Sequence, residues 1–388
     1  MAEKELTKSK LMTKFLKESN KLFEVRKAKA ITRMRTGSPK LDVLTNGGFP
    51  VNAITEIWGP ENSGKSTMGI VVAVENFPKA YSEGKYTAIL DLEGRGDIEY
   101  WIKLGAPFYK DEETGEYECL YHDEDGTPYW QIIHAIDGTG EATMQAILDM
   151  VASKLYSIIV LDSVAMLSAK AEQEKRITTG SNAMGLQARL LARATRLLPE
   201  KIKTSGTTLV FLNHWRSQTD TMQQKFNSNM SPGGKAFHHA VSLQLETFHP
   251  TDDYHDENKG QKKNVKRLEL RYYLRKTSVS ERKRGLNSTF LVKDKESELY
   301  YIDKPEEMFD VAKDTGVFLN LSGEAFKSGN CYFDGKLWGY EGDTYEEAPD
   351  GRLAIGLNKS GATKSLKKDK ELYLAVKEAI YSKLGPAS

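Results

Sequence analysis

The chain is poor in cysteine, lacks long apolar runs and carries almost no net charge. Its two cysteines, Cys119 and Cys331, lie far apart and form no CxxC motif, which argues against a disulfide framework and predicts a reducing compartment, the cytoplasm. No apolar run reaches about 18 residues, so we expect no membrane-spanning helix, and the Lys-rich N-terminus lacks the apolar core of a secretion signal. Because the net charge is only +1, binding to nucleic acid cannot rest on overall charge.

Charge is nevertheless segregated along the chain. Residues 1–35 hold eleven Lys and Arg against four acidic residues, and residues 259–284 hold eleven against two. Residues 111–125 hold eight acidic residues and no Lys or Arg. The basic runs predict a face that binds a polyanion, with a solvated surface as the alternative for any single run.

The clearest motif is GPENSGKST, which fits the phosphate-binding pattern G-x-x-x-x-G-K-[ST]. Its two glycines allow the tight turn that lets backbone N–H groups converge on a phosphate. Lys65 adds a positive charge near the β- and γ-phosphates, and the Ser66 hydroxyl can bind Mg²⁺. An apolar strand-like run precedes the motif, and a helix-like run follows it. The motif predicts a site for ATP and Mg²⁺ made by Gly59, Pro60, Glu61, Asn62, Ser63, Gly64, Lys65, Ser66 and Thr67.

Three further strand-like runs end in polar side chains. TAILDLEG presents Asp91 and Glu93, YSIIVLDS ends near Asp162, and TLVFLNH ends in Asn213 and His214. Ligands of open α/β sheets bind at the carboxyl ends of the strands. A carboxylate there can activate an attacking water, and Asp162 can hold the water shell of Mg²⁺. The Asn213–His214 pair could sense a γ-phosphate.

The order of these runs predicts three parts. Residues 37–292 alternate strand-like and helix-like runs, which predicts an α/β core with a mainly parallel sheet and helices on both faces. Residues 1–36 are expected to form a charged helical arm that docks on a neighbour or extends into solvent. Residues 293–388 are expected to form a small α+β domain with short strands and a final helix near 369–384. HDEDGTPYW is a turn signal that predicts an acidic hairpin insertion over residues 108–132.

Within the core, the pattern assigns the main elements. We expect an amphipathic helix in MGLQARLLARATRLLPEKI, residues 184–202. We expect strands in TAILDLEG, YSIIVLDSVAMLS, TTLVFLNHW, AVSLQLETF and RLELRYYL.

In order and spacing, these motifs resemble the RecA family of recombinases, in its divergent phage type. The similarity covers roughly residues 36–245 and continues weakly to 285. It runs from TGSPKLDVLTNGGFP through GPENSGKST, ILDLEGRGDIEYWIKLGA, IIVLDSVAMLSAKAE, MGLQARLLARATR and LVFLNHWR to SPGGKAF. The resemblance implies a RecA-type P-loop ATPase core and a DNA-dependent ATPase. It also implies a role in homologous recombination and DNA repair, with helical filaments on single-stranded DNA and strand exchange with double-stranded DNA.

The resemblance also implies roles for single residues. Glu93 matches the catalytic base, and Asp97 and Tyr100 match positions that recognise adenine. Asn213 and His214 match a polar pair, usually Asn-Gln, that couples the γ-phosphate to the DNA loop. The histidine is a departure that makes the charge of the pair pH-dependent, and a packed strand-end histidine is the alternative.

Two segments, residues 172–185 and 215–234, match the DNA-binding loops of the family. Both are polar and rich in Gly, Ser and Asn, so a surface loop without such a role is the alternative. The resemblance and the loop composition together suggest DNA contacts by Lys175, Arg176, Met184, Gly185, Arg189, Arg196, Arg216, Lys225, Gly233 and Gly234.

ATP sites of the family lie between protomers, where basic residues of a neighbour reach the γ-phosphate. Here that role would fall to Arg275 and Lys276, with His238 as the alternative, because the usual Lys-x-Lys spacing is not kept. The arm would build a homo-oligomeric filament, with single-strand-binding and mediator proteins as further partners. A RecA-fold hexameric helicase or motor, or another ATP-gated DNA-binding ATPase, is the alternative function. A kinase is disfavoured because no acceptor site or lid is recognisable.

Overall fold

The computed structural model describes the chain from residue 31 to residue 383, with gaps. The described residues are 31–134, 138–168, 186–217, 229–231, 233–250, 267–278, 285–294, 297–320, 322–328, 330–333, 346–347 and 352–383. The chain divides into two units, residues 1–31 and 32–388, and the described elements belong to the second. Residues 1–30 of the expected helical arm and the whole first expected DNA-binding loop lie outside the described residues. The end of the arm, residues 31–36, is described and contains the short strand β1 (Arg33–Met34) rather than helix. No helix in the described part is long and apolar enough to cross a membrane.

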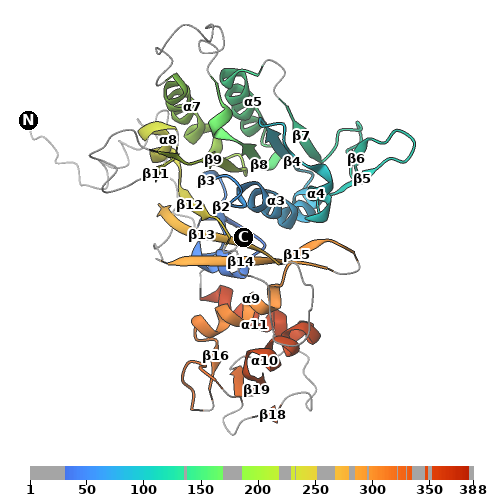
Figure 1. Cartoon of the computed structure of the whole chain (residues 1–388), viewed down its shortest axis with the longest axis vertical. Helices are drawn as coiled ribbons and strands as arrows, with labels where there is room; N and C mark the ends of the chain where they lie inside the picture. The colour runs from blue at the N-terminus through green and yellow to red at the C-terminus, as the bar shows by residue number, and fades with distance from the viewer. Residues whose placement is uncertain are drawn as a thin grey trace, which may run out of the picture. The chain divides into compact units, whose positions relative to one another are not determined.

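A nine-stranded sheet organises the described core, in the order β15-β14-β13-β12-β3-β9-β8-β4-β7 (Figure 1). Strands β12, β3, β9, β8, β4 and β7 run parallel, and β13, β14 and β15 extend the sheet antiparallel. This arrangement confirms the predicted α/β class. The strands are β3 (Ala53–Gly59), β4 (Tyr86–Asp91), β7 (Trp130–Ile133), β8 (Tyr156–Asp162), β9 (Thr208–His214), β12 (Leu243–Phe248), β13 (Arg267–Thr277), β14 (Leu286–Lys293) and β15 (Tyr300–Ile302).

Helices cover both faces of this sheet (Figure 1). Successive strand residues point to opposite faces, so Ile158 and Val160 of β8 pack in one core and Ile159 and Leu161 in the other. The first core contains α3 (Lys65–Ser82) and α4 (Ile98–Lys103), and the second contains α5 (Gly140–Ser153), α7 (Leu186–Ile202) and α8 (Gly234–Ala240). The amphipathic helix expected over 184–202 is thus confirmed as α7.

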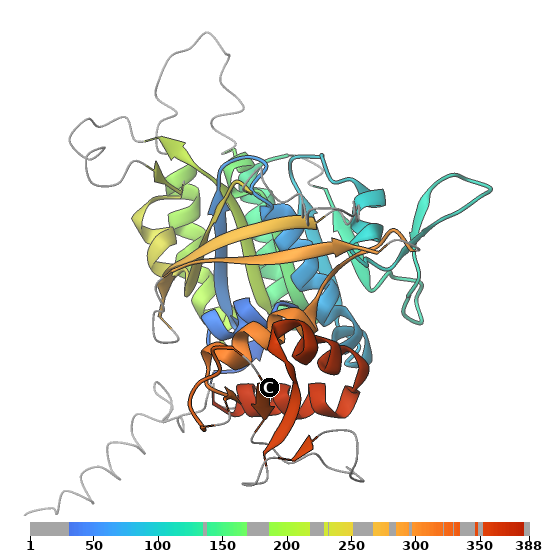
Figure 2. The same cartoon turned by 60° about the horizontal axis from the view of Figure 1, so that its bottom comes forward.

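The C-terminal part has a hydrophobic core of its own, and Figure 2 shows the helices and strands that form it. It consists of α9 (Lys304–Asp314), α10 (Asn358–Lys368), α11 (Lys370–Ser382) and a sheet of β16 (Phe318–Leu319), β17 (Asn330–Phe333), β19 (Leu353–Leu357) and β18 (Glu346–Glu347). The final helix is confirmed as α11, whereas α9 and α10 were not anticipated. The main sheet continues beyond residue 293, through β15 to Ile302. The domain boundary expected at residue 293 remains a prediction.

The acidic insertion is a hairpin, but it is shorter than expected. Strand β5 (Phe108–Lys110) pairs antiparallel with β6 (Tyr117–Cys119), and the chain turns at residues 111–116. A second turn follows, closed by a bridge between His122 and Pro128. The expected extension to residue 132 was wrong, because Trp130 begins β7 and pairs in parallel with Thr87 of the main sheet.

Four short strands and two short helical segments complete the described core. β1 (Arg33–Met34) pairs antiparallel with β2 (Phe49–Pro50) on either side of α2 (Pro39–Leu44). β10 (Arg216–Ser217) pairs antiparallel with β11 (Asn229–Met230), and a single helical turn, η1 (Val164–Met166), follows β8.

Candidate nucleotide and nucleic-acid site

The predicted phosphate loop connects β3 to α3, and its backbone is fixed by two glycines. Gly64 is the N-cap of α3 and has a φ of +81°, in the left-handed region. A Cβ on Gly64 would lie 2.4 Å from Leu270 Cδ2, and one on Gly59 would lie 2.3 Å from Thr247 Oγ1. Both positions therefore require glycine, because strands β12 and β13 pack directly against the loop.

Lys65 lies under this loop and is only 5% exposed. Its Nζ donates to the carbonyl oxygens of Pro60 at 2.5 Å and Gly59 at 3.3 Å. Burial lowers the pKa of Lys65, and the carboxylates of Asp162 and Glu93 partly oppose this effect. A lysine that is held only by carbonyl groups at the N-terminus of an 18-residue helix can exchange them for an anion. The loop therefore fits a phosphate group.

The two residues predicted to bind Mg²⁺ lie together. Ser66 Oγ donates to Asp162 Oδ2 at 2.5 Å. Burial raises the pKa of Asp162 to about 6, with a further increase from neighbouring carboxylates and a decrease from the Ser66 hydrogen bond and Lys65. A hydroxyl and a carboxylate are oxygen ligands, which Mg²⁺ prefers. In the described part of the chain no group of three or more His, Cys, Asp or Glu side chains is arranged to hold a metal ion. A Mg²⁺ that also binds substrate phosphates needs no such group.

Glu93, the predicted base, is held by two neighbours through one oxygen. Its Oε1 accepts hydrogen bonds from Ser163 Oγ and from His214 Nε2, each at 2.7 Å. Burial would raise the pKa of Glu93, but these two hydrogen bonds and the positive charge nearby outweigh it and hold the pKa below its ordinary value. The carboxylate is therefore ionised at neutral pH, as a general base requires. The sequence analysis did not predict a role for Ser163. The only signal for it in the sequence is its position directly after Asp162.

The structure separates the predicted Asn213–His214 pair. His214 contacts Glu93, whereas Asn213 is fully buried and donates from Nδ2 to Glu56 Oε1 at 2.8 Å. Sequence reasoning also missed Glu56, although it is the lone acidic residue in the apolar strand AITEIWG. Sensing of the γ-phosphate by Asn213 remains a prediction.

Asp97 and Tyr100, the predicted adenine contacts, lie on α4 beside the phosphate loop. Asp97 is the N-cap of α4 and accepts a hydrogen bond from the Tyr100 backbone N–H at 3.2 Å. The Tyr100 hydroxyl lies 3.1 Å from Thr67 Oγ1, and its ring meets that of Tyr300 edge to face. Their contact with adenine remains a prediction.

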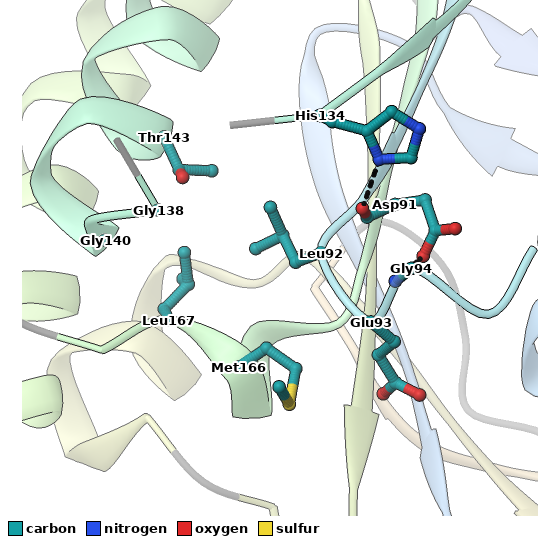
Figure 3. Close-up of a pocket in the computed structure, with 10 residues that line it drawn as sticks. All are labelled: Asp91, Leu92, Glu93, Gly94, His134, Gly138, Gly140, Thr143, Met166 and Leu167. Carbon is teal, nitrogen blue, oxygen red and sulfur yellow. Dashed lines mark hydrogen bonds between the residues drawn. The ribbon is translucent and has the colours of Figure 1, made fainter. Parts of the chain in front are cut away.

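A cavity of about 240 Å³ lies beyond the carboxyl ends of β4 and β7, and Glu93, the predicted base, lines it. Asp91 and Glu93 line one side and the start of α5 the other (Figure 3). His134 Nδ1 lies 3.2 Å from the Asp91 carbonyl oxygen, and Met166 and Leu167 form an apolar part of the wall. The cavity is large enough to hold water next to Glu93.

The described part of the predicted DNA-binding surface is carried by α7. Leu191, Leu198 and other residues bury one face of this helix, while Arg189 and Arg196 are exposed, as is Arg193 between them. Their spacing places the three guanidinium groups along one helical stripe. Gly233 is the N-cap of α8, Gly234 is its first residue, and Arg216 lies on β10. Lys175, Arg176, Met184, Gly185 and Lys225 lie outside the described residues.

Arg275 and Lys276, the predicted cations for a neighbour's ATP site, have partners within their own subunit. Arg275 Nε donates to Glu246, and its guanidinium lies over the ring of Tyr273. Lys276 Nζ donates to the carbonyl oxygens of His238 and, at 2.6 Å, Val241, which end α8. Action in trans would require both side chains to leave these partners, and that role remains a prediction.

Comparison with known sequences identifies the family of the chain. A profile described as the RecA N-terminal domain matches residues 4–111 and 119–274, more than half of the chain. Proteins named Protein RecA are similar: that of Ureaplasma parvum serovar 3 is 31% identical over 238 residues, 61% of this chain and 63% of the relative. That of Chlorobium chlorochromatii is 33% identical over 239 residues, which are 61% of this chain and 59% of the relative. That of Frankia casuarinae is 36% identical over 213 residues, which are 54% of this chain and 53% of the relative. The chain spans less than two thirds of the length of these relatives. Because this family match covers more than half of the chain, the chain belongs to the RecA family of recombinases.

Proposed function

We propose that this chain binds and hydrolyses ATP with Mg²⁺ and, in its ATP-bound state, forms filaments on single-stranded DNA that promote strand exchange in recombination and repair. The observation that carries the proposal is the convergence of Lys65, the Ser66–Asp162 pair and Glu93 at the carboxyl ends of the parallel strands β3, β8 and β4. Family membership supports the DNA partners, the filament and a cytoplasmic site of action. An origin in a phage is a further part of the proposal that the relatives do not test.

Each residue has a distinct part in the proposed reaction. Lys65 would bind the β- and γ-phosphates, and Ser66 and Asp162 would hold Mg²⁺. The metal ion, when bound, supplies charge neutralisation at the phosphate oxygens. Glu93 would accept a proton from the attacking water, with Ser163 and His214 fixing the orientation of its carboxylate.

The exposed arginine stripe of α7 supports binding to a polyanion. Arg189, Arg193 and Arg196 take part in no ion pair with another described residue, so they can contact DNA phosphates without breaking an internal contact. Such contacts give affinity that is independent of base sequence, which a strand-exchange protein needs.

Two substitutions test the ATP site. We expect Lys65→Ala to abolish ATP turnover, while Lys79→Ala, a solvent-exposed lysine on the same helix, leaves it unchanged. We expect Glu93→Gln to bind ATP but to hydrolyse it at least about 100-fold more slowly, because the base is lost and the shape is kept. Near-normal turnover by Lys65→Ala would contradict the site.

Electron microscopy tests the assembly. With single-stranded DNA and a slowly hydrolysed ATP analogue, we expect the wild-type protein and Glu93→Gln to form helical filaments. Closed rings would instead favour a hexameric helicase or motor, and isolated monomers would favour another ATP-gated DNA-binding ATPase.

A further inference from the structure

Glu56 is a fully buried carboxylate in the middle of the parallel sheet. It lies on β3, between β9 on one side and β12 on the other. Its Oε1 accepts from Asn213 Nδ2 at 2.8 Å, and its Oε2 accepts from Gln244 Nε2 at 2.7 Å. A buried carboxylate is costly unless each oxygen is hydrogen-bonded, so these partners are needed for Glu56 to remain in place.

Further partners of Glu56 come from the chain that follows β11. The Ser231 hydroxyl lowers the pKa of Glu56, and His238 Nδ1 of α8 lies 3.8 Å from its Oε2. Ser231 and His238 also contact each other, since His238 Nε2 lies 3.1 Å from the Ser231 carbonyl oxygen. Burial raises the pKa of Glu56, and the hydrogen bonds and the nearby histidine oppose that increase.

These contacts connect two chain positions that flank the antiparallel pair β10–β11. Asn213 lies shortly before β10, and Ser231 follows β11 directly. Glu56 therefore has polar partners in the chain on both sides of this strand pair, with Asn213 before it and His238 after it. The described contacts also continue to the catalytic carboxylate, because Asn213 Oδ1 accepts from the His214 backbone N–H at 3.0 Å and His214 contacts Glu93.

We propose that Glu56 is a positioning residue that holds the two ends of the β10–β11 pair together and couples them to the Glu93–His214 contact. In this arrangement a change at Glu93 moves His214 and Asn213, and Glu56 transmits the movement to Ser231 and α8. The coupling of ATP to DNA affinity rests on the function proposed above. The connection that Glu56 makes between the two ends of the β10–β11 pair, called the Glu56 clasp below, rests only on the described contacts.

The test compares Glu56→Gln with the wild type in the full chain. Gln presents one acceptor and one NH₂ donor, so one of its two amide partners would face a donor instead of an acceptor. We expect amide hydrogen exchange at residues 214–217 and 229–231 to rise by about tenfold in the protein without ligand. We expect the ratio of single-stranded DNA affinities with and without a slowly hydrolysed ATP analogue to fall at least about fivefold. Affinity for the analogue itself should change less than about twofold.

Two further variants make the result specific. In the double variant Glu56→Gln/Asn213→Asp, donor and acceptor are exchanged across the same hydrogen bond, so we expect slow hydrogen exchange to be restored in the protein without ligand. Glu307→Gln, which also replaces a buried carboxylate but lies in the C-terminal part, should leave both readouts unchanged. If Glu56→Gln does not fold, Ser231→Ala removes one partner outside the main sheet and should shift both readouts in the same direction.

The outcomes separate the clasp from the proposed function. Wild-type exchange and a wild-type affinity ratio in Glu56→Gln would overturn the clasp. Faster exchange that the double variant does not reverse would also overturn it, because general loosening of β3 would then be the cause. If the wild-type protein binds single-stranded DNA equally well with and without the ATP analogue, both the proposed function and the coupling are overturned. Hydrogen exchange in Glu56→Gln then still decides whether Glu56 holds the strand pair.

Discussion

Replacing Glu307 with glutamine is expected to stabilise the protein at about pH 8 and to leave its stability at low pH nearly unchanged. Glu307 lies on α9 and is 4% exposed. Ser38 Oγ donates to its Oε2 at 2.6 Å, and the Lys40 backbone N–H donates to the same oxygen at 3.3 Å. Burial raises the pKa of Glu307 from its ordinary value of 4.5 to about 7, although these contacts oppose the increase.

The sign of the effect follows from the direction of this pKa change. Because the pKa is higher in the folded state than in the unfolded chain, folding favours the protonated carboxyl group. The contribution of Glu307 to stability is therefore complete below about pH 4.5 and is lost as the pH rises through about 7. The pKa difference corresponds to about 3 kcal/mol. Gln stays neutral and can still accept from Ser38, so the expected gain at about pH 8 is up to about 3 kcal/mol.

Asp310 on the same helix provides a control of opposite sign. Burial would raise the pKa of Asp310, but Lys359 and Lys40, each with Nζ at 2.8 Å from the carboxylate, lower it below its ordinary value. Its contribution is present above the unfolded pKa and is lost on acidification, so Asp310→Asn should destabilise the protein at neutral pH. Urea unfolding followed by circular dichroism at about pH 5 and about pH 8 measures both variants. A loss of stability in Glu307→Gln that is equal at both pH values would refute the reasoning.

Two further predictions concern the proposed site. Arg189→Ala and Arg196→Ala should each weaken binding to single-stranded DNA and reduce the slope of log affinity against log salt by about one; fluorescence titrations at several salt concentrations check this, and unchanged slopes would place the DNA path elsewhere. Ser163→Ala removes a hydrogen bond that lowers the pKa of Glu93, so the pKa of Glu93 should rise and the acidic limb of the ATPase pH profile should move to higher pH. Ser82→Ala, at the far end of α3, is the matched control. An acidic limb that does not move in Ser163→Ala would show that Ser163 does not lower the pKa of Glu93.

Features encoded in short stretches of sequence could be predicted. The phosphate loop depends on glycines and a lysine at fixed spacing, and the buried strands β4, β8 and β9 depend on continuous apolar runs. Helix α7 was predictable because its buried residues recur at helical spacing. The proximity of Ser66 and Asp162 also followed, since the carboxyl ends of parallel strands meet at one edge of the sheet.

Features that depend on strand register could not be predicted. The partners of Glu56 come from β9 and β12, which are distant from it in sequence, and only the pairing of β3 with both strands brings them together. Helix α10 was missed because its sequence, NKSGATKSLKK, has few apolar residues and contains a glycine. The hairpin was predicted to extend too far along the chain, because Trp130 and its apolar neighbours are as compatible with a strand of the insertion as with a strand of the main sheet.

The packing of β12 and β13 against the phosphate loop has a consequence for biosynthesis. The loop is translated early, but Thr247 and Leu270, which lie behind its glycines, emerge from the ribosome about two hundred residues later. Until β12 and β13 have been synthesised, β3 lacks its pairing with β12, and the loop lacks the side chains that pack against its glycines. A nascent chain therefore has the whole nucleotide motif in its sequence without a finished nucleotide site. The proposed ATP site is therefore complete only after β12 has paired with β3 and β13 has joined the sheet.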